Sequence, residues 1–203
     1  MKTIICTIVL CAFACLAHAQ QDTKTQEQSE AKSESPVTTS AQAHEITMAS
    51  AQLEPKSGSQ VTGFVSFVKV GDELRVAGLI QNLTPGKHGL HIHDKGDCSA
   101  SDAASAGAHF NPTHQHHGGP TTAEHHAGDL GNIEADTSGK AVLSLTAKLE
   151  LSGKDSIIGK SVVVHEKEDD LKSDPAGNSG ARVACGVIKV SEMPRAPTTT
   201  PKD

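Results

Sequence analysis

The chain has 203 residues, of which 12 are histidine and 18 glycine, with only 4 Phe and no Trp or Tyr. This length fits one domain with flanking segments, and the formal net charge of −6 excludes a general nucleic-acid binder, because neutralising phosphates requires a surplus of Lys and Arg. Outside the first sixteen residues, no apolar run approaches the length of a transmembrane helix. The histidine content is the feature that needs an explanation.

The first 19 residues have the features of a secretory signal peptide. Lys2 supplies a positive charge, residues 4–16 form a short apolar core, and residues 17–19 (Ala-His-Ala) form a cleavage site. A membrane anchor is one alternative, which the shortness of the apolar run disfavours, and a lipidated Cys15 is another. We therefore expect residues 1–19 to be removed during export to the periplasm or the extracellular space.

Polar segments flank the central part of the chain. Residues 20–43 and 194–203 contain almost nothing to bury, which predicts a disordered linker and a disordered tail around a folded domain of residues 44–193. Removal of the signal peptide would leave only Cys98 and Cys185 of the five cysteines. An even pair in an exported protein predicts one disulfide.

The domain is predicted to be all-β. Residues 61–68 and 73–80 are strand-like runs on either side of a tight Gly71-Asp72 turn, and residues 141–151 alternate between apolar and polar side chains, which is typical of a half-buried strand. Further strand-like runs lie at 46–53, 89–93, 160–165 and 182–190. Short strands separated by turns, without an amphipathic helix, predict an antiparallel sandwich or barrel.

Two segments interrupt this pattern, residues 94–135 and 166–181. Both are long, polar and rich in Gly, Pro or Asp, and nearly all the histidines lie inside them or at their edges. Loops of this length in a compact domain are usually functional. We therefore expect the chemistry of the protein in these loops.

The histidine spacing predicts a metal site. His91 and His93 lie two residues apart, so they share one face of a strand, although such a pair alone is more often a surface feature. His165 ends an apolar strand, where a lone histidine is more often part of the core or the surface. A series of further ligand types lies within 21 residues, namely His109, His114, His116, His117, His125, His126 and Asp129. A metal held by His and Asp would order such a loop, and the alternative is a loop that takes up metal nonspecifically.

Several motifs, in chain order, resemble the copper–zinc superoxide dismutase family across residues 45–190. The resemblance implies a Greek-key antiparallel β-sandwich or barrel of about eight strands with two long functional loops. The motifs are Gly89-Leu90-His91-Ile92-His93, residues 106–112 (AGAHFNP), 117–120 (HGGP), 126–130 (HAGDL), 164–166 (VHE) and 180–188 (GARVACGVI).

The same resemblance implies one copper and one zinc in each subunit, with His109 shared between them. The residue types agree, because four imidazoles suit copper, whereas three imidazoles and a carboxylate suit structural zinc. The implied copper ligands are His91, His93, His109 and His165, and the implied zinc ligands are His109, His117, His126 and Asp129.

Three further roles follow from the resemblance. Arg182 would dock an anionic substrate, the cysteine pair would tie the first long loop to the sheet, and Asp169 would orient one ligand of each metal. An ordinary exposed loop aspartate is the alternative for Asp169. The implied activity is dismutation of superoxide to dioxygen and hydrogen peroxide by one-electron cycling of copper, with His109 carrying a proton, as an antioxidant defence outside the cytoplasm. A non-catalytic copper or zinc carrier on the same fold, or a structural adhesion sandwich, are the alternatives.

The sequence also departs from the family pattern. The loop 166–181 is shorter than in the animal enzymes, Asp174-Pro175-Ala176 stands where a lysine and a threonine are expected, and Lys167 and Lys172 are candidates for attracting the substrate. The segment before Cys98 is also short, as in exported bacterial forms. A homodimer stays open, because two apolar residues, Ile158 and Val190, match interface positions of the animal enzymes.

Overall fold

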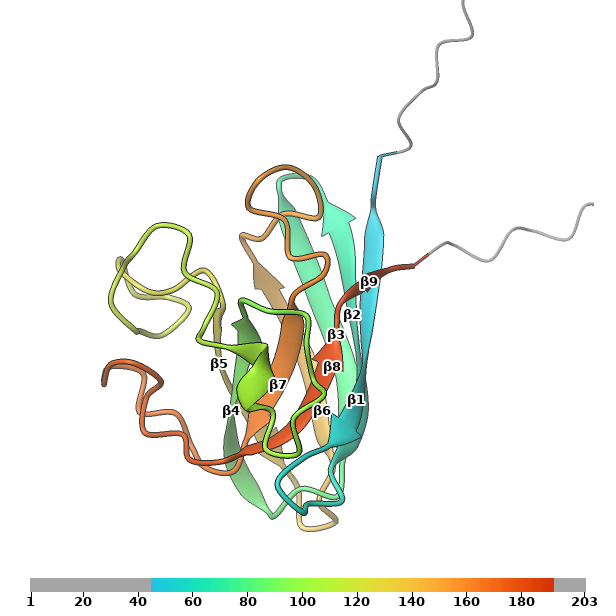
Figure 1. The fold of residues 1–203 in the computed structure, drawn as a ribbon, viewed down its shortest axis with the longest axis vertical. Coiled ribbons are helices and arrows are strands. Elements are labelled where there is room, and N and C mark those ends of the chain that lie inside the picture. Colours follow the sequence, from blue (N-terminus) through green and yellow to red (C-terminus); the bar gives the residue numbers. More distant parts are fainter. Residues whose placement is uncertain (1–44, 192–203) are drawn as a thin grey trace, which may run out of the picture. The chain divides into compact units, whose positions relative to one another are not determined.

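Nine β-strands and one turn of 3₁₀ helix make up the fold of residues 45–191, the part of the chain that the computed structural model describes (Figure 1). The predicted signal peptide, linker and tail lie outside the described residues. The strands are β1 (Met48–Pro55), β2 (Thr62–Val70), β3 (Glu73–Gln81), β4 (Gly86–His93), β5 (Asp129–Ala135), β6 (Ala141–Ala147), β7 (Ser161–His165), β8 (Arg182–Val187) and β9 (Lys189–Val190), and the 3₁₀ turn is Ala104–Ala106.

The strands form one antiparallel sheet in the order β5-β4-β7-β8-β1-β2-β3-β6, with the short β9 paired to β1. The end strands β5 and β6 contact each other, so the sheet rolls into a nearly closed barrel. Strand β3 pairs with β6, and β4 pairs with β7, so two connections cross the barrel as in a Greek key. The all-β, antiparallel fold class predicted from the sequence is confirmed.

The alternation in β6 places Ala141 and Leu143 in the core and leaves Val142 and Ser144 exposed. The predicted strand of residues 141–151 is too long, however, because β6 ends at Ala147. Leu149 and Leu151 are still buried. The apolar side chains thus continue to point inward after the strand hydrogen bonds have ended, and the alternation alone could not show where the ladder stops.

A second correction concerns the first long loop. Residues 94–135 were predicted to lack strands, but β5 (Asp129–Ala135) occupies the end of this segment and pairs with β4. Its sequence holds Gly131 and Asn132, which weaken a local strand pattern. The second long segment, residues 166–181, contains no strand and agrees with the prediction.

Strand β4 is covered on both faces. Its side chains Leu90 and Ile92 point into the apolar core, while His91 and His93 point to the other face and are also fully buried. Figure 1 shows the loops 94–128 and 166–181 on the same side of the barrel, beside β4 and β5. These loops, rather than solvent, therefore surround the histidine face of β4.

Candidate metal centre

The four histidines assigned to copper lie together. Strand β4 presents His91 and His93 on one face, His165 ends the neighbouring β7, and a β-bridge between His93 and His109 holds the loop against β4. All four are buried, and ligand nitrogens of the four lie within 4.8 Å of one another. Three of the four positions are set by strand pairing, so a long-range fold is needed to assemble the cluster.

The four residues assigned to zinc form an adjoining cluster that shares His109. One ligand atom from each lies within 4.8 Å of the others, and all four residues are buried. Asp129, at the start of β5, has Oδ1 2.8 Å from His109 Nδ1 and accepts a backbone hydrogen bond from His126 at Oδ2. Gly118 donates its N–H to the same Oδ2. The carboxylate thus fixes the loop around the cluster as well as taking part in it.

Three ring nitrogens in these clusters are buried without a hydrogen-bond partner among the described residues: His91 Nδ1, His109 Nε2 and His117 Nδ1. A buried polar atom left unpaired costs about 1–3 kcal/mol. Two further nitrogens, His93 Nε2 and His165 Nε2, face each other at 3.4 Å. Ring nitrogens that are grouped within 4.8 Å in each cluster fit metal ions, which take up lone pairs that no protein donor satisfies.

The second ring nitrogen of several histidines is already engaged. His93 Nδ1 donates to Gly107 O at 2.8 Å, and His165 Nδ1 lies 3.3 Å from Gly180 O. Such bonds fix the tautomer and direct the other nitrogen toward the centre of the cluster.

Three of the buried histidines, His91, His93 and His165, are neutral at neutral pH. Burial lowers the pKa of His91 to about 4, that of His93 to about 2 and that of His165 to about 3. Burial acts to raise the pKa of Asp129, but hydrogen bonds from His109 and Gly118 outweigh it and lower the value to about 2. At neutral pH these three histidines therefore offer free imidazole lone pairs, and Asp129 is a charged carboxylate.

Asp169 lies between the two clusters and is fully buried. Its Oδ2 is 2.7 Å from His91 Nε2, and its Oδ1 is 2.9 Å from His117 Nε2. Asn132 on β5, which the sequence analysis missed, holds the Asp169 backbone through two hydrogen bonds of 2.8 and 2.9 Å. No local pattern indicated Asn132, because its partner lies 37 residues away.

Arg182 lies at the edge of the copper-type cluster, where its backbone pairs with His165. Its guanidinium donates to Ala103 O at 2.7 Å and to Gly107 O at 2.8 Å, and the side chain stays partly accessible. Gly107 O also accepts the hydrogen bond from His93. One loop carbonyl therefore positions both the arginine and a candidate ligand.

The cysteine pair is joined. A disulfide links Cys98 in the first loop to Cys185 in β8, 87 positions along the chain.

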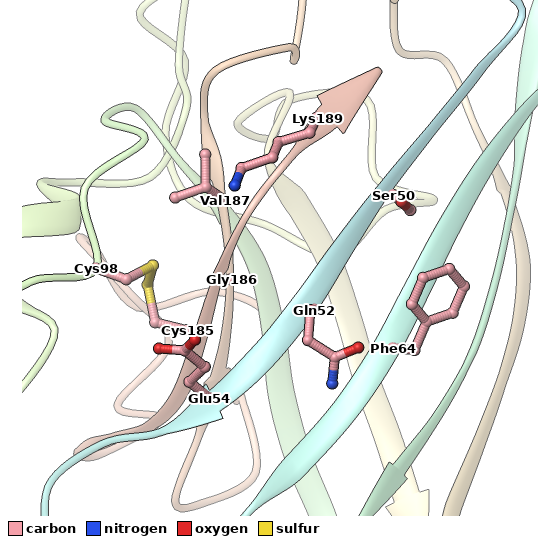
Figure 2. Close-up of a pocket in the computed structure, with 9 residues that line it drawn as sticks. All are labelled: Ser50, Gln52, Glu54, Phe64, Cys98, Cys185, Gly186, Val187 and Lys189. Carbon is pink, nitrogen blue, oxygen red and sulfur yellow. A yellow bond between two sulfur atoms is a disulfide. The ribbon is translucent and has the colours of Figure 1, made fainter. Parts of the chain in front are cut away.

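A surface pocket lies beside the disulfide on the outer side of β1, lined among others by Gln52, Phe64 and Lys189 (Figure 2). No histidine lines this pocket, so it is separate from the two clusters.

Several sequence candidates lie outside both clusters. His114, His116 and His125 belong to neither, and Lys167 and Lys172 are exposed. Within residues 45–191, no helix is both long and apolar enough to cross a membrane.

Comparison with known proteins identifies relatives. Residues 61–188 match the family model of copper/zinc superoxide dismutase. A Caenorhabditis elegans protein named extracellular superoxide dismutase [Cu-Zn] is 44% identical over 152 residues, which cover 71% of this chain and 68% of the relative. Superoxide dismutase [Cu-Zn] 5 of Dictyostelium discoideum is 41% identical over 145 residues, covering 67% and 95%. A crystal structure of the clock protein EA4 superimposes with a TM-score of 0.66 at 41% identity, covering 71% of this chain and 95% of that one.

Proposed function

This chain belongs to the copper/zinc superoxide dismutase family, and we propose that it converts superoxide to dioxygen and hydrogen peroxide outside the cytoplasm. Membership makes it a superoxide dismutase that uses copper and zinc. The observation that carries the proposal is the pair of buried clusters that share His109, in which three buried ring nitrogens have no hydrogen-bond partner among the described residues.

We assign one set of metal ligands to each cluster. Copper would be held by His91, His93, His109 and His165, and zinc by His109, His117, His126 and Asp129, one ion of each per chain. When bound, copper supplies one-electron redox chemistry and zinc a closed structural site. His109 would offer a different ring nitrogen to each ion, since its Nδ1 faces Asp129 and its Nε2 is unpaired.

The protein attracts and protonates its substrate through its own side chains. The net charge is negative, so a local positive charge must draw in superoxide. We assign this role to Arg182, whose guanidinium donates to Ala103 O and Gly107 O; superoxide dismutase is itself a standard example of such steering. We assign His109 Nε2 as the atom that carries one of the two protons to the peroxide. The balanced reaction consumes two superoxide anions and two protons.

Secretion to the extracellular space is part of the proposal. The signal-peptide pattern of residues 1–19 supports export. The Caenorhabditis elegans, Brugia pahangi and Drosophila melanogaster relatives are all named extracellular superoxide dismutases. Detection of the chain in culture medium, with its N-terminus at Gln20, would test this.

A homodimer is also proposed. Val190 on β9 is 48% exposed, and Ile158 is partly buried against the core. The next residue after Ile158, Gly159, donates its N–H to Ile188 O, just before β9. Val190 and Ile158 offer an apolar surface for a second copy. The mass of the purified protein in solution would decide this, because a monomeric mass contradicts the assembly.

Metal analysis combined with a superoxide-consumption assay tests the proposed function. We expect one copper and one zinc per chain and catalytic removal of superoxide. A fully loaded protein that does not consume superoxide would favour the carrier function. A protein that binds neither ion would contradict the ligand assignment.

A further inference from the structure

Besides Asp129, whose Oδ2 lies 3.1 Å from its Nδ1, His117 contacts two further carboxylates. Its ring contacts Asp169, as described above, and its backbone N–H donates to Asp174 Oδ1 at 2.7 Å. The other oxygen, Asp174 Oδ2, lies 2.6 Å from Nδ1 of the neighbouring His116. The two bonds join segments that are 57 and 58 residues apart in the chain.

The short loop that carries Asp174 is braced by its own hydrogen bonds. The Asp170 carboxylate accepts from the backbone N–H of Ser173 at 2.8 Å and from the side chain of Asn178 at 2.8 Å. The carbonyl of Ser173 in turn accepts the N–H of Gly177 at 2.7 Å. These hydrogen bonds hold the backbone on both sides of Asp174, so its carboxylate is fixed where it contacts His116 and His117.

The contact requires a hydrogen-bond acceptor at position 174. The His117 N–H is a donor, so a carboxylate or amide oxygen can pair with it, whereas a methyl group cannot. Replacing Asp174 by alanine would therefore remove the contact, and replacing it by asparagine would keep it.

We propose that Asp174 is a positioning residue for the zinc site, where it fixes the backbone of His117 and slows the release of zinc. The proposal rests on the assignment of His117 to zinc in the proposed function. Asp169 directs the ring of His117, and Asp174 holds its main chain, so the two carboxylates restrain different parts of one ligand. Outer hydrogen bonds of this kind change metal affinity by about 10–100-fold.

The test measures zinc release from the copper- and zinc-loaded protein to a chromogenic chelator. We expect Asp174→Ala to release zinc about tenfold faster, with copper retained, because Asp174 contacts none of the copper-type ligands. Asp174→Asn keeps an oxygen that accepts the His117 N–H, so it should restore most of the slow release. Asp136→Ala is the matched control, since Asp136 is another exposed aspartate that accepts backbone N–H groups, from Ser138 and Lys140.

Cobalt(II) substituted at the zinc site gives a second readout. Its visible spectrum should shift in Asp174→Ala and stay unchanged in Asp136→Ala, because the spectrum reports ligand geometry. Zinc release at the wild-type rate in Asp174→Ala, or equal loss of copper and zinc, would overturn the proposal. A His117→Ala variant that still binds a full zinc would instead overturn the ligand assignment, and the role of Asp174 with it.

Discussion

Gly177 leaves open the space that the carboxylate of Asp169 occupies. A β-carbon at position 177 would overlap Asp169 Oδ1 and would lie 2.8 Å from His117 Nε2. Gly177 also has φ of +61°, a conformation that side chains rarely adopt. The bridge that Asp169 makes between the two clusters therefore depends on the absence of a single side chain.

We expect Gly177→Ala to push Asp169 out of the bridge and to lower both copper and zinc content by about tenfold after dialysis against a chelator. Gly153→Ala is the matched control, because Gly153 also has a positive φ, +82°, but its added β-carbon would meet nothing within 4 Å. The control measures backbone strain alone. Equal metal loss in the two variants would show that strain, and not displacement of Asp169, is the cause.

Reversing the charge of Arg182 should slow catalysis without removing metal. Steering contributes about 10–1,000-fold to association rates, so Arg182→Glu should consume superoxide at least about tenfold more slowly. Its rate should also rise with salt, whereas the wild-type rate should fall, because salt screens both repulsion and attraction. Arg75→Glu is the matched control, because it changes the net charge by the same amount at an exposed arginine of β3, away from the site. Unchanged activity of a metal-replete Arg182→Glu protein would contradict the steering role.

Removing the disulfide should destabilise the fold. Cys98 and Cys185 are 87 positions apart in the chain, a loop for which the chain-entropy model gives about 4–5 kcal/mol, with smaller values usual in practice. We expect the Cys98→Ser/Cys185→Ser double variant to lose a substantial part of this free energy of unfolding in urea titrations of the metal-free protein. Identical midpoints for the variant and the oxidised wild type would refute this.

The metal-free protein should lose stability in mild acid. The folded-state pKa values of His91, His93 and His165 lie below the ordinary value of 6.5. The unfolded chain therefore binds more protons below pH 6.5, so stability falls as the pH falls from 6.5 toward the folded values. The loss at pH 5 is on the order of 2 kcal/mol per histidine as an upper bound. Urea unfolding of the metal-free protein at pH 5 and 7.5 measures it, and equal free energies at the two pH values would contradict the prediction.

The local patterns of the sequence predicted most of the barrel. The bounds of the predicted runs 61–68 and 73–80 agree with those of β2 and β3 within one or two residues. These two strands pair with each other across a short turn, so the local sequence contains both partners of the hairpin. Strand β5 was not predicted, because it pairs with β4 across a long loop and contains residues that favour turns. The predicted end of β6 was wrong because the side chains of Leu149 and Leu151 remain buried beyond the last strand hydrogen bond.

The sequence predicted the residues of the two clusters better than the residues that support them. The ordered motifs identified every residue of the two clusters, and the structure brings these residues together. The residues that support the cluster residues could be predicted only in part. Asn132 and Asp174 were missed because each contacts the backbone of a residue far away in the chain, 37 and 57 positions respectively. A sequence pattern records residue types at a spacing, and it does not record which main-chain groups a distant loop will reach.

The carbonyl of Gly107 joins the arginine, a candidate ligand and the disulfide-anchored loop in one arrangement. The loop that holds the Arg182 guanidinium is attached to the barrel by the His93–His109 β-bridge and by the Cys98–Cys185 disulfide. Under the role proposed for Arg182, reduction of this disulfide would loosen the segment that positions the guanidinium. The oxidation state of two thiols would then affect the attraction of the substrate as well as the stability of the fold.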